Sequence, residues 1–375
     1  ATYFLSKRLD KYGQNPVDYP GLARDLGRLF LGRDLQCAQC HDHLFIEDYK
    51  QVDFQGLFAF IRNVGINRQS KMPAVTEKPT TKKVTFSSVF KPGEKETGPK
   101  LPGQSEVVIP KLKRDEIYLV KPDRKKRTAG VPRFSTLKTL AKILPSPENE
   151  SFARNIVNRL WFVLMGRGLV HPLDLDHKAN PPSHPKLLSM LSKEFVRHKF
   201  DIKWMIRTLV QTETYQRSTI LPKGQKKQKP ETFLTALERR LSAEQLLRSM
   251  IQATGHKLEE KQRATLRKSF LQAYANPARE PEIDFTPSLR SALFVLNDST
   301  IQDWLKPKTG NLTQRLSKLS EEKIINEAYL SILSRFPSEE EKSALLAHLK
   351  SKDRAKAIEQ LVWALLASTE FALNH

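Results

Sequence analysis

The stretch Cys37-Ala38-Gln39-Cys40-His41 reads C-x-x-C-H and contains both of the chain's cysteines. Two thiols at this spacing lie on one turn, where each can add to a vinyl group of the same porphyrin. His41 is then held under the ring, with an imidazole nitrogen directed at the iron. The motif therefore predicts covalently bound haem c, with thioethers at Cys37 and Cys40 and with His41 as an axial ligand of the iron.

Three other uses of these residues stay open. A cysteine pair at this spacing can be a redox dithiol, although such pairs usually begin a helix after a strand, and no strand pattern precedes Cys37. The two cysteines with His41 and His43 can supply four zinc ligands, although ligands so close in sequence crowd a tetrahedral site. A disulfide across two intervening residues would be strained or catalytic. The complete C-x-x-C-H pattern favours haem over all three.

The length and hydropathy are those of a soluble globular protein. With 375 residues, the chain is long enough for two or three domains with hydrophobic cores. Hydrophobic residues make up 39% of it, the mean hydropathy is −0.49, and the apolar runs are much shorter than a membrane span. We therefore expect no membrane-spanning segment.

The start of the chain lacks the charged and apolar regions of a signal peptide. Haem is nevertheless attached to C-x-x-C-H outside the cytoplasm. We therefore expect a periplasmic or otherwise extracytoplasmic protein, either with its signal removed or as a fragment of a longer chain.

The net charge is strongly positive. The chain has 63 Lys and Arg residues against 41 Asp and Glu, which gives +22 and a sequence pI near 9.9. Such a balance attracts anionic partners, and we expect an acidic redox protein or an anionic polysaccharide. Nucleic acid is not expected, because no zinc finger, RNP-like stretch or basic zipper is present. A basic surface that merely keeps the chain soluble would explain the charge as well.

The apolar periodicity predicts a mainly α protein that begins with a helical haem-binding segment, residues 1–68. One amphipathic run in it ends at Gly32 and a second ends near Gly65, on either side of the motif. The apolar positions are Leu22, Leu26, Leu29 and Phe30 in the first run and Phe54, Leu57, Phe58 and Ile61 in the second. These side chains either wall the porphyrin or form ordinary core.

Residues 69–144 are predicted to be an insertion rich in proline and lysine. Short β-branched runs at 84–86, 107–109 and 117–120 predict strands within it. The basic run 124–127 is more typical of a solvated turn than of a binding patch.

Residues 145–375 are predicted to be a larger helical domain. One helix face is formed by Phe152, Ile156, Leu160, Val163 and Leu164, with Gly166 as its stop. Ser183 is expected to cap the next helix. Two capping boxes, Ser242 with Gln245 and Ser338 with Glu341, predict further helix starts, and the first of these helices is expected to end at Gly255.

Several stretches together resemble a known family. They are Phe30–Gly32, Leu35–His43, Asp53–Phe60, Phe152–Arg154, Val157–Trp161, Gly166–Val170, Asn180–Pro185, Arg240–Leu247, Ser368–Phe371 and Asn374-His375. On these stretches the chain resembles the planctomycete cytochrome-c-like family, joined to the helical domain of unknown function that usually follows it in large secreted proteins. The resemblance implies a haem c protein, while the family's biochemical role is itself poorly established.

Two features depart from that family. Its members usually carry a longer helical stretch before the motif, and Leu44 stands where they usually have a proline after the Asp-His pair. The shorter start suggests a processed product or part of a larger polypeptide, so other chains of a larger assembly are possible partners.

The second axial ligand decides what the iron does. A methionine or histidine there gives a closed site suited to electron transfer, whereas an empty position permits small-molecule or peroxide chemistry. Met72, in Lys71-Met72-Pro73, and His184, within the stretch 180–185, are the two candidates.

The sequence leaves open whether the chain is an enzyme, since it has no nucleophile elbow, P-loop or dinucleotide fingerprint. We expect an extracytoplasmic c-type cytochrome that exchanges electrons with a partner. The alternatives are a haem-dependent oxidative enzyme and a basic polysaccharide-binding component of a secreted assembly.

Overall fold

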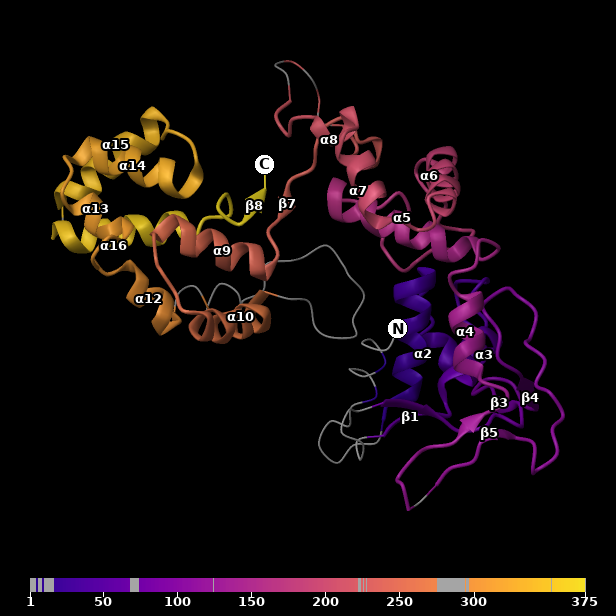
Figure 1. The fold of residues 1–375 in the computed structure, drawn as a ribbon. Coiled ribbons are helices and arrows are strands. Elements are labelled where there is room, and N and C mark those ends of the chain that lie inside the picture. The colour runs from indigo at the N-terminus through magenta and orange to yellow at the C-terminus, as the bar shows by residue number, and fades with distance from the viewer. Residues whose placement is uncertain are drawn as a thin grey trace. The chain divides into compact units, whose positions relative to one another are not determined.

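A computed structural model describes residues 5, 9, 17–67, 74–123, 125–221, 224, 226, 228–274, 294, 297–351 and 353–374. The described residues are mainly helical: 49% of them are in helices, they include 14 α-helices, and their strands are few and short, which confirms the predicted fold class (Figure 1). The described residues up to Arg217, with those of 228–236, belong to one compact unit. Those from Leu237 onward make up nearly all of a second unit.

The first unit begins with helix α2 (Tyr19–Leu31). Asp18 caps its start, because the Asp18 carboxylate accepts a hydrogen bond from the Gly21 N–H, and a proline occupies the first turn. The helix ends at Gly32 in the left-handed conformation, at a φ of 68°, as the sequence predicted. Its buried face includes Leu22 and Leu26.

Helix α3 (Gln51–Ile61) follows the motif and packs against α2 and against the short 3₁₀ turn η1 (Cys37–Gln39) that carries the motif. Its apolar residues Phe54, Leu57 and Ile61 are buried as expected. The predicted end near Gly65 is wrong. The helix stops at Ile61, and Gly65 lies in strand β1 (Val64–Asn67), paired antiparallel with β2 (Ala74–Glu77).

The insertion holds two more hairpins, β3 (Val84–Ser87) with β4 (Glu94–Thr97) and β5 (Tyr118–Val120) with β6 (Val131–Pro132). The strands expected at 84–86 and 117–120 are therefore confirmed. The strand expected at 107–109 is wrong, because among the described residues this segment pairs with no strand. Lys125, Lys126 and Arg127 are exposed in a turn, and Arg124 lies outside the described residues.

The remaining α-helices described in the first unit are α4 (Thr136–Ile143), α5 (Glu150–Met165), α6 (Pro185–Arg197), α7 (Ile202–Val210) and α8 (Glu213–Gln216). Helix α5 ends at Gly166 as predicted, but its predicted face is rotated by one residue. Val163 is 65% exposed, and the buried stripe consists instead of Ala153, Val157 and Trp161. These three pack against α6 and α7, whose positions the periodicity of α5 does not reveal.

The predicted cap of α6 is also wrong by one residue. His184 occupies the N-cap position, and no side-chain hydrogen bond caps the helix there. Pro185 takes the first helical position, where its fixed φ suits the helix and its missing N–H costs nothing. The helix therefore starts on the proline, and Ser183 lies one residue too early to be its cap.

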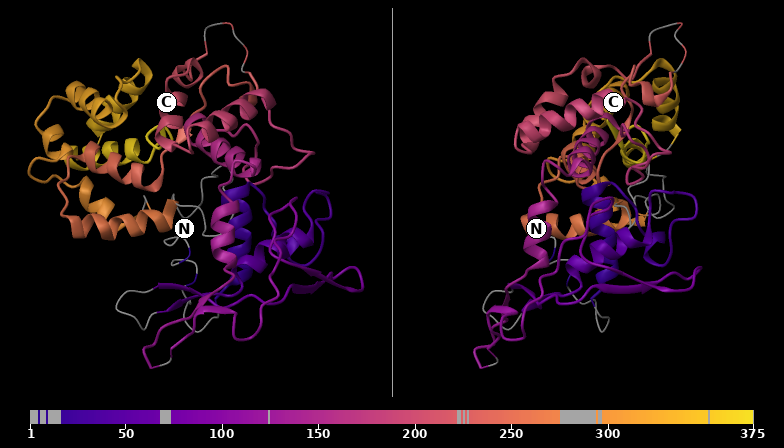
Figure 2. Two further views of the ribbon diagram at one scale, coloured as in Figure 1. Left: turned by 45° about the vertical axis from the view of Figure 1, so that its right-hand side comes forward. Right: turned by 90° about the vertical axis from the view of Figure 1, so that its right-hand side faces the viewer.

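The second unit is a helical assembly, seen in orange and yellow in Figures 1 and 2. Its elements are α9 (Ala243–Thr254), α10 (Glu260–Tyr274), α12 (Ser299–Leu305), α13 (Leu312–Ser317), α14 (Glu321–Leu333), α15 (Glu339–Ser351), α16 (Arg354–Leu366), and the paired strands β7 (Arg239–Arg240) and β8 (Leu373–Asn374). Both capping boxes are confirmed, and α9 ends at Gly255 as predicted. Among the described helices, none is both long and apolar enough to span a membrane.

Candidate functional site

The C-x-x-C-H motif folds into a short 3₁₀ turn. The Cys40 N–H donates to the Cys37 carbonyl at 3.4 Å, and Ala38 between the cysteines is fully buried. Both cysteine side chains are exposed, and neither forms a disulfide. The turn therefore packs its backbone against the protein and leaves both thiols accessible to a ligand from outside.

The imidazole of His41 is oriented by the next residue. Its Nδ1 atom lies 2.6 Å from the backbone carbonyl oxygen of Asp42. Because a carbonyl oxygen only accepts, we assign the proton to Nδ1, which leaves the lone pair of Nε2 available. A metal-binding histidine typically has this arrangement, with its second nitrogen donating to a carbonyl. The partly exposed ring also contacts Phe90, with centroids 4.6 Å apart.

Four large apolar side chains border the motif and face solvent; we call them the apolar rim. They are Leu44, Phe45, Val89 and Phe90, which are 66%, 89%, 66% and 63% exposed. Phe90 contacts His41, Phe45 contacts the ring of His43, and the Val89 N–H donates to the Cys40 carbonyl at 3.1 Å. Large apolar groups gathered on a surface usually mark a binding site, because leaving them in water is unfavourable.

His43 has a local structural role. Its Nδ1 accepts hydrogen bonds from the N–H groups of Phe45 and Ile46 at 3.1 and 2.9 Å. Burial is the main cause that lowers its pKa, followed by repulsion from His41. In the part of the chain that the structure describes, no three His, Cys, Asp or Glu side chains are grouped to hold a metal ion. The zinc interpretation therefore has no ligand set among those residues.

The two candidate distal ligands have different outcomes. Met72 lies outside the described residues. His184 precedes α6, where its Nδ1 lies 3.1 Å from the Ser183 hydroxyl and its ring lies 5.8 Å from that of Phe233. Its role as an iron ligand stays a prediction, and these local contacts give it a structural explanation.

The structure brings another histidine, His177, to the motif segment. Its ring packs edge-on against Tyr49, with centroids 5.7 Å apart, and the same tyrosine packs against His43. The loop that carries it is held on both sides of the motif, because the Asp34 N–H donates to the Asp174 carbonyl and the Lys178 N–H to the Asp48 carboxylate, each at 2.7 Å. His177 had no distinguishing sequence context, since this proximity arises from residues far apart in the chain.

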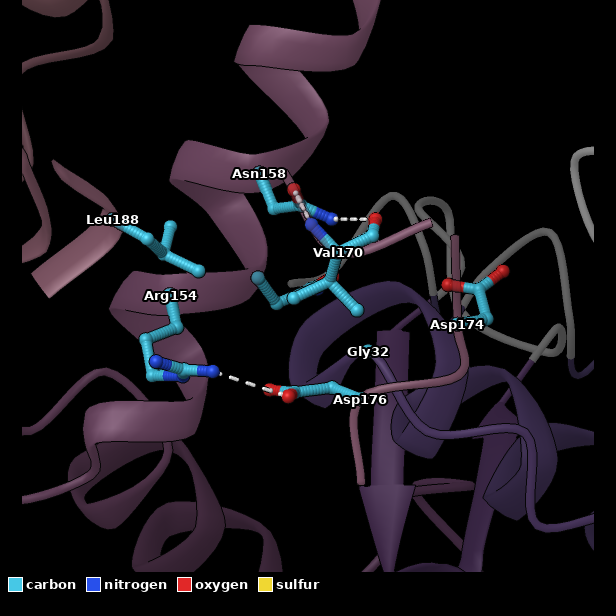
Figure 3. A pocket seen from close by; sticks show the side chains of 8 residues that line it. Gly32, Arg154, Asn158, Val170, Asp174, Asp176 and Leu188 are labelled. Carbon is cyan, nitrogen blue, oxygen red and sulfur yellow. Dashed lines mark hydrogen bonds and ion pairs between the residues drawn. The ribbon is translucent and has the colours of Figure 1, made fainter. Parts of the chain in front are cut away.

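A small polar cleft is lined by residues of this loop, of α5 and of the end of α2 (Figure 3). Arg154 points to Asp176 across it, with an N–O distance of 3.2 Å. The Asn158 amide makes two hydrogen bonds of 2.9 Å with the backbone of Val170. Arg154 and Asn158 of α5 thus bind residues 170–176 and hold this part of the loop on the helix.

Buried charges reinforce the same junction. The nearly inaccessible carboxylate of Asp174 pairs with Arg159 of α5, and Arg28 of α2 lies 4.0 Å from it. The Asn155 amide donates to the Leu29 carbonyl at 2.8 Å. These contacts join the motif-bearing segment to α5, and sequence reasoning did not identify them.

Two family models match parts of the chain. Residues 7–65 match PSCyt2, described as "Protein of unknown function (DUF1549)", and residues 137–268 match PSD1, described as "Protein of unknown function (DUF1553)". Both are planctomycete-type domain families, which supports that part of the resemblance. Neither description mentions a cytochrome or haem. No curated protein and no solved structure matches the chain.

Proposed function

We propose that the chain binds haem c covalently at the turn Cys37–His41 and exchanges electrons with an acidic partner outside the cytoplasm. One observation carries the proposal: two exposed thiols and a histidine whose Nε2 has no hydrogen bond among the described residues lie beside exposed apolar side chains, of which Phe90 contacts the ring of His41. A flat, largely apolar macrocycle would cover this rim and use all three ligating groups.

Each residue has a defined task in this proposal. Cys37 and Cys40 would hold the porphyrin covalently through two thioether bonds, one to each vinyl group. His41 offers Nε2 to the iron, with its ring held by the Asp42 carbonyl. The apolar rim excludes water from one edge of the ring. When bound, the haem supplies a one-electron redox centre whose potential depends on these contacts.

His177 is our candidate for the second axial ligand. No hydrogen bond to either of its ring nitrogens is present among the described residues, and its loop is fixed beside residues 48–49. His184, by contrast, is engaged by Ser183 and Phe233. Met72, which lies outside the described residues, is the second candidate.

The net charge of +22 supports an acidic partner. Opposite charges raise the rate of diffusional encounter. Dissolved salt weakens this attraction, and near physiological ionic strength charges more than about 8–10 Å apart are largely screened from each other. Electron exchange with an acidic redox protein should therefore slow as salt is added, whereas exchange with a small neutral reductant should not.

Denaturing electrophoresis with haem staining tests the proposal. The full chain, produced in cells that attach haem c, should carry haem that stays with the denatured polypeptide. A Cys37→Ser, Cys40→Ser double variant should lose the stain. An unstained wild-type band would contradict the proposal. Visible and electron paramagnetic resonance spectra then separate the two haem functions. Low-spin iron that does not bind carbon monoxide indicates electron transfer, and high-spin iron that binds it indicates an oxidative enzyme.

A further inference from the structure

We propose that Gln51 is a positioning residue that joins the motif turn to the apolar rim, an inference that rests on the proposed haem site. Gln51 is the first residue of α3 and is only 3% exposed. Its side-chain amide donates to the Ser87 carbonyl at 3.0 Å and lies 3.5 Å from the Gln39 carbonyl. Its backbone N–H donates to the Asp42 carboxylate at 2.9 Å.

These three contacts reach three parts of the site. Gln39 lies between the two cysteines, and Asp42 supplies the carbonyl that orients His41. Ser87 ends strand β3, two residues before Val89 of the apolar rim. One buried residue therefore connects the thiol turn, the residue that orients the axial histidine, and the segment that carries half of the rim.

The chemistry of the contacts requires an amide at this position. An NH₂ group has two donors, and both of its neighbours here are carbonyl oxygens, which only accept. A glutamate of nearly the same shape would place acceptor oxygens against these carbonyls in a buried site. A buried polar group without a matching partner is strongly unfavourable, so the substitution would separate the turn from strand β3.

Gln55, one turn further along α3, provides a matched control. Its amide also donates to the Gln39 carbonyl, at 3.2 Å, but among the described residues it makes no hydrogen bond to Ser87 or Asp42. It is also only half-buried, so a carboxylate there can turn toward solvent. Gln55→Glu therefore removes one contact to the motif turn and leaves the connection to the rim intact.

The experiment compares the full chain with its Gln51→Glu and Gln55→Glu variants, all produced in cells that attach haem c. We expect Gln51→Glu to carry severalfold less haem per polypeptide. Its remaining haem should have a lower reduction potential and a broadened visible spectrum, because the displaced rim admits water to the ring. Gln55→Glu keeps the connection to the rim and should change all three measurements less than Gln51→Glu does.

If Gln51→Glu does not fold, as judged by circular dichroism, Gln51→Met decides instead, because it keeps the size and apolar packing without a charge. Faster amide hydrogen exchange at Val89 in Gln51→Met, together with the shifted potential, would support the proposal. Wild-type haem content, potential and exchange in the folded variant would overturn it. Absence of haem from the wild type would instead contradict the proposed function itself, so the two failures are distinguishable.

Discussion

Nδ1 of His41 lies 2.6 Å from the carbonyl oxygen of Asp42, and the Asp42 carboxylate in turn accepts the Gln51 N–H at the start of α3. Asp42 therefore links the imidazole of His41 to the first residue of α3 and fixes the orientation of the ring. In the proposed site, this arrangement would direct Nε2 toward the iron before haem is bound.

Replacing His41 by alanine should leave the haem attached, since both cysteines remain, but should remove one axial ligand. We expect a change to high-spin iron in the visible and paramagnetic resonance spectra. Free imidazole should restore the low-spin spectrum by filling the vacated space. His43→Ala is the control. His43 accepts hydrogen bonds from two backbone N–H groups, so this variant should keep the wild-type iron spectrum. An unchanged spectrum in His41→Ala would exclude His41 as a ligand.

The second axial position can be tested by replacing His177 and His184 separately. We expect His177→Ala to produce iron that binds carbon monoxide, because its ring is packed beside the motif segment on Tyr49. His184→Ala should keep the wild-type spectrum, because its contacts are with Ser183 and Phe233. Carbon monoxide difference spectra of the reduced proteins measure both effects. If neither variant binds carbon monoxide, Met72 becomes the candidate to replace next.

The buried ion pair between Asp174 and Arg159 should be important for stability. Arg159→Met removes one partner of a nearly inaccessible carboxylate, and such a loss typically costs about 3–5 kcal/mol. Lys178→Met is the matched control, since Lys178 is almost fully exposed and its pairing with Asp48 is worth at most about 1 kcal/mol. Urea unfolding of both variants measures the difference. Equal stability of the two would show that the buried pair has little net effect.

Much of the fold could be predicted because its signals are local. Gly32, Gly166 and Gly255 end helices through their own left-handed backbone conformation, and the box of Ser242 and Gln245 acts within a single turn. The buried stripe of α5 is displaced by one residue from the predicted one, because the helix also carries apolar residues next to its buried stripe. Only the packing of α6 and α7 selects which of them are buried.

The candidate site divides in the same way. The motif is contiguous, so its cysteines and histidine could be read directly from the sequence. Val89 and Phe90 come from the hairpin segment after β3, and His177 comes from a loop beyond α5. None of these three residues belongs to a motif or a periodic apolar pattern. Gln51 belongs to no motif or apolar pattern, and only the contacts of its amide distinguish it.

Acid should destabilise the second unit through the ion pairs of Arg335. The guanidinium of Arg335 pairs with both Glu341 and Glu370, at 2.9 and 2.6 Å, and its hydrogen bonds are the main cause that lowers the pKa of Glu341 from 4.5 to about 2. A carboxyl group whose folded pKa is lowered stabilises the fold above its unfolded pKa and loses that effect as the pH falls through its folded pKa. The contribution of Glu341 is therefore complete above about pH 4.5 and lost between there and about pH 2.

Glu341→Gln should accordingly lower the melting temperature of the second unit at pH 7 and make it less dependent on pH between 5 and 2. Glu322→Gln is the control, because Glu322 is largely exposed and lies 3.9 Å from its partner Lys342. Melting curves followed by circular dichroism across this pH range measure both variants. The assignment would fail if Glu341→Gln kept the pH profile of the wild type, since the lost carboxyl would then have no part in acid unfolding.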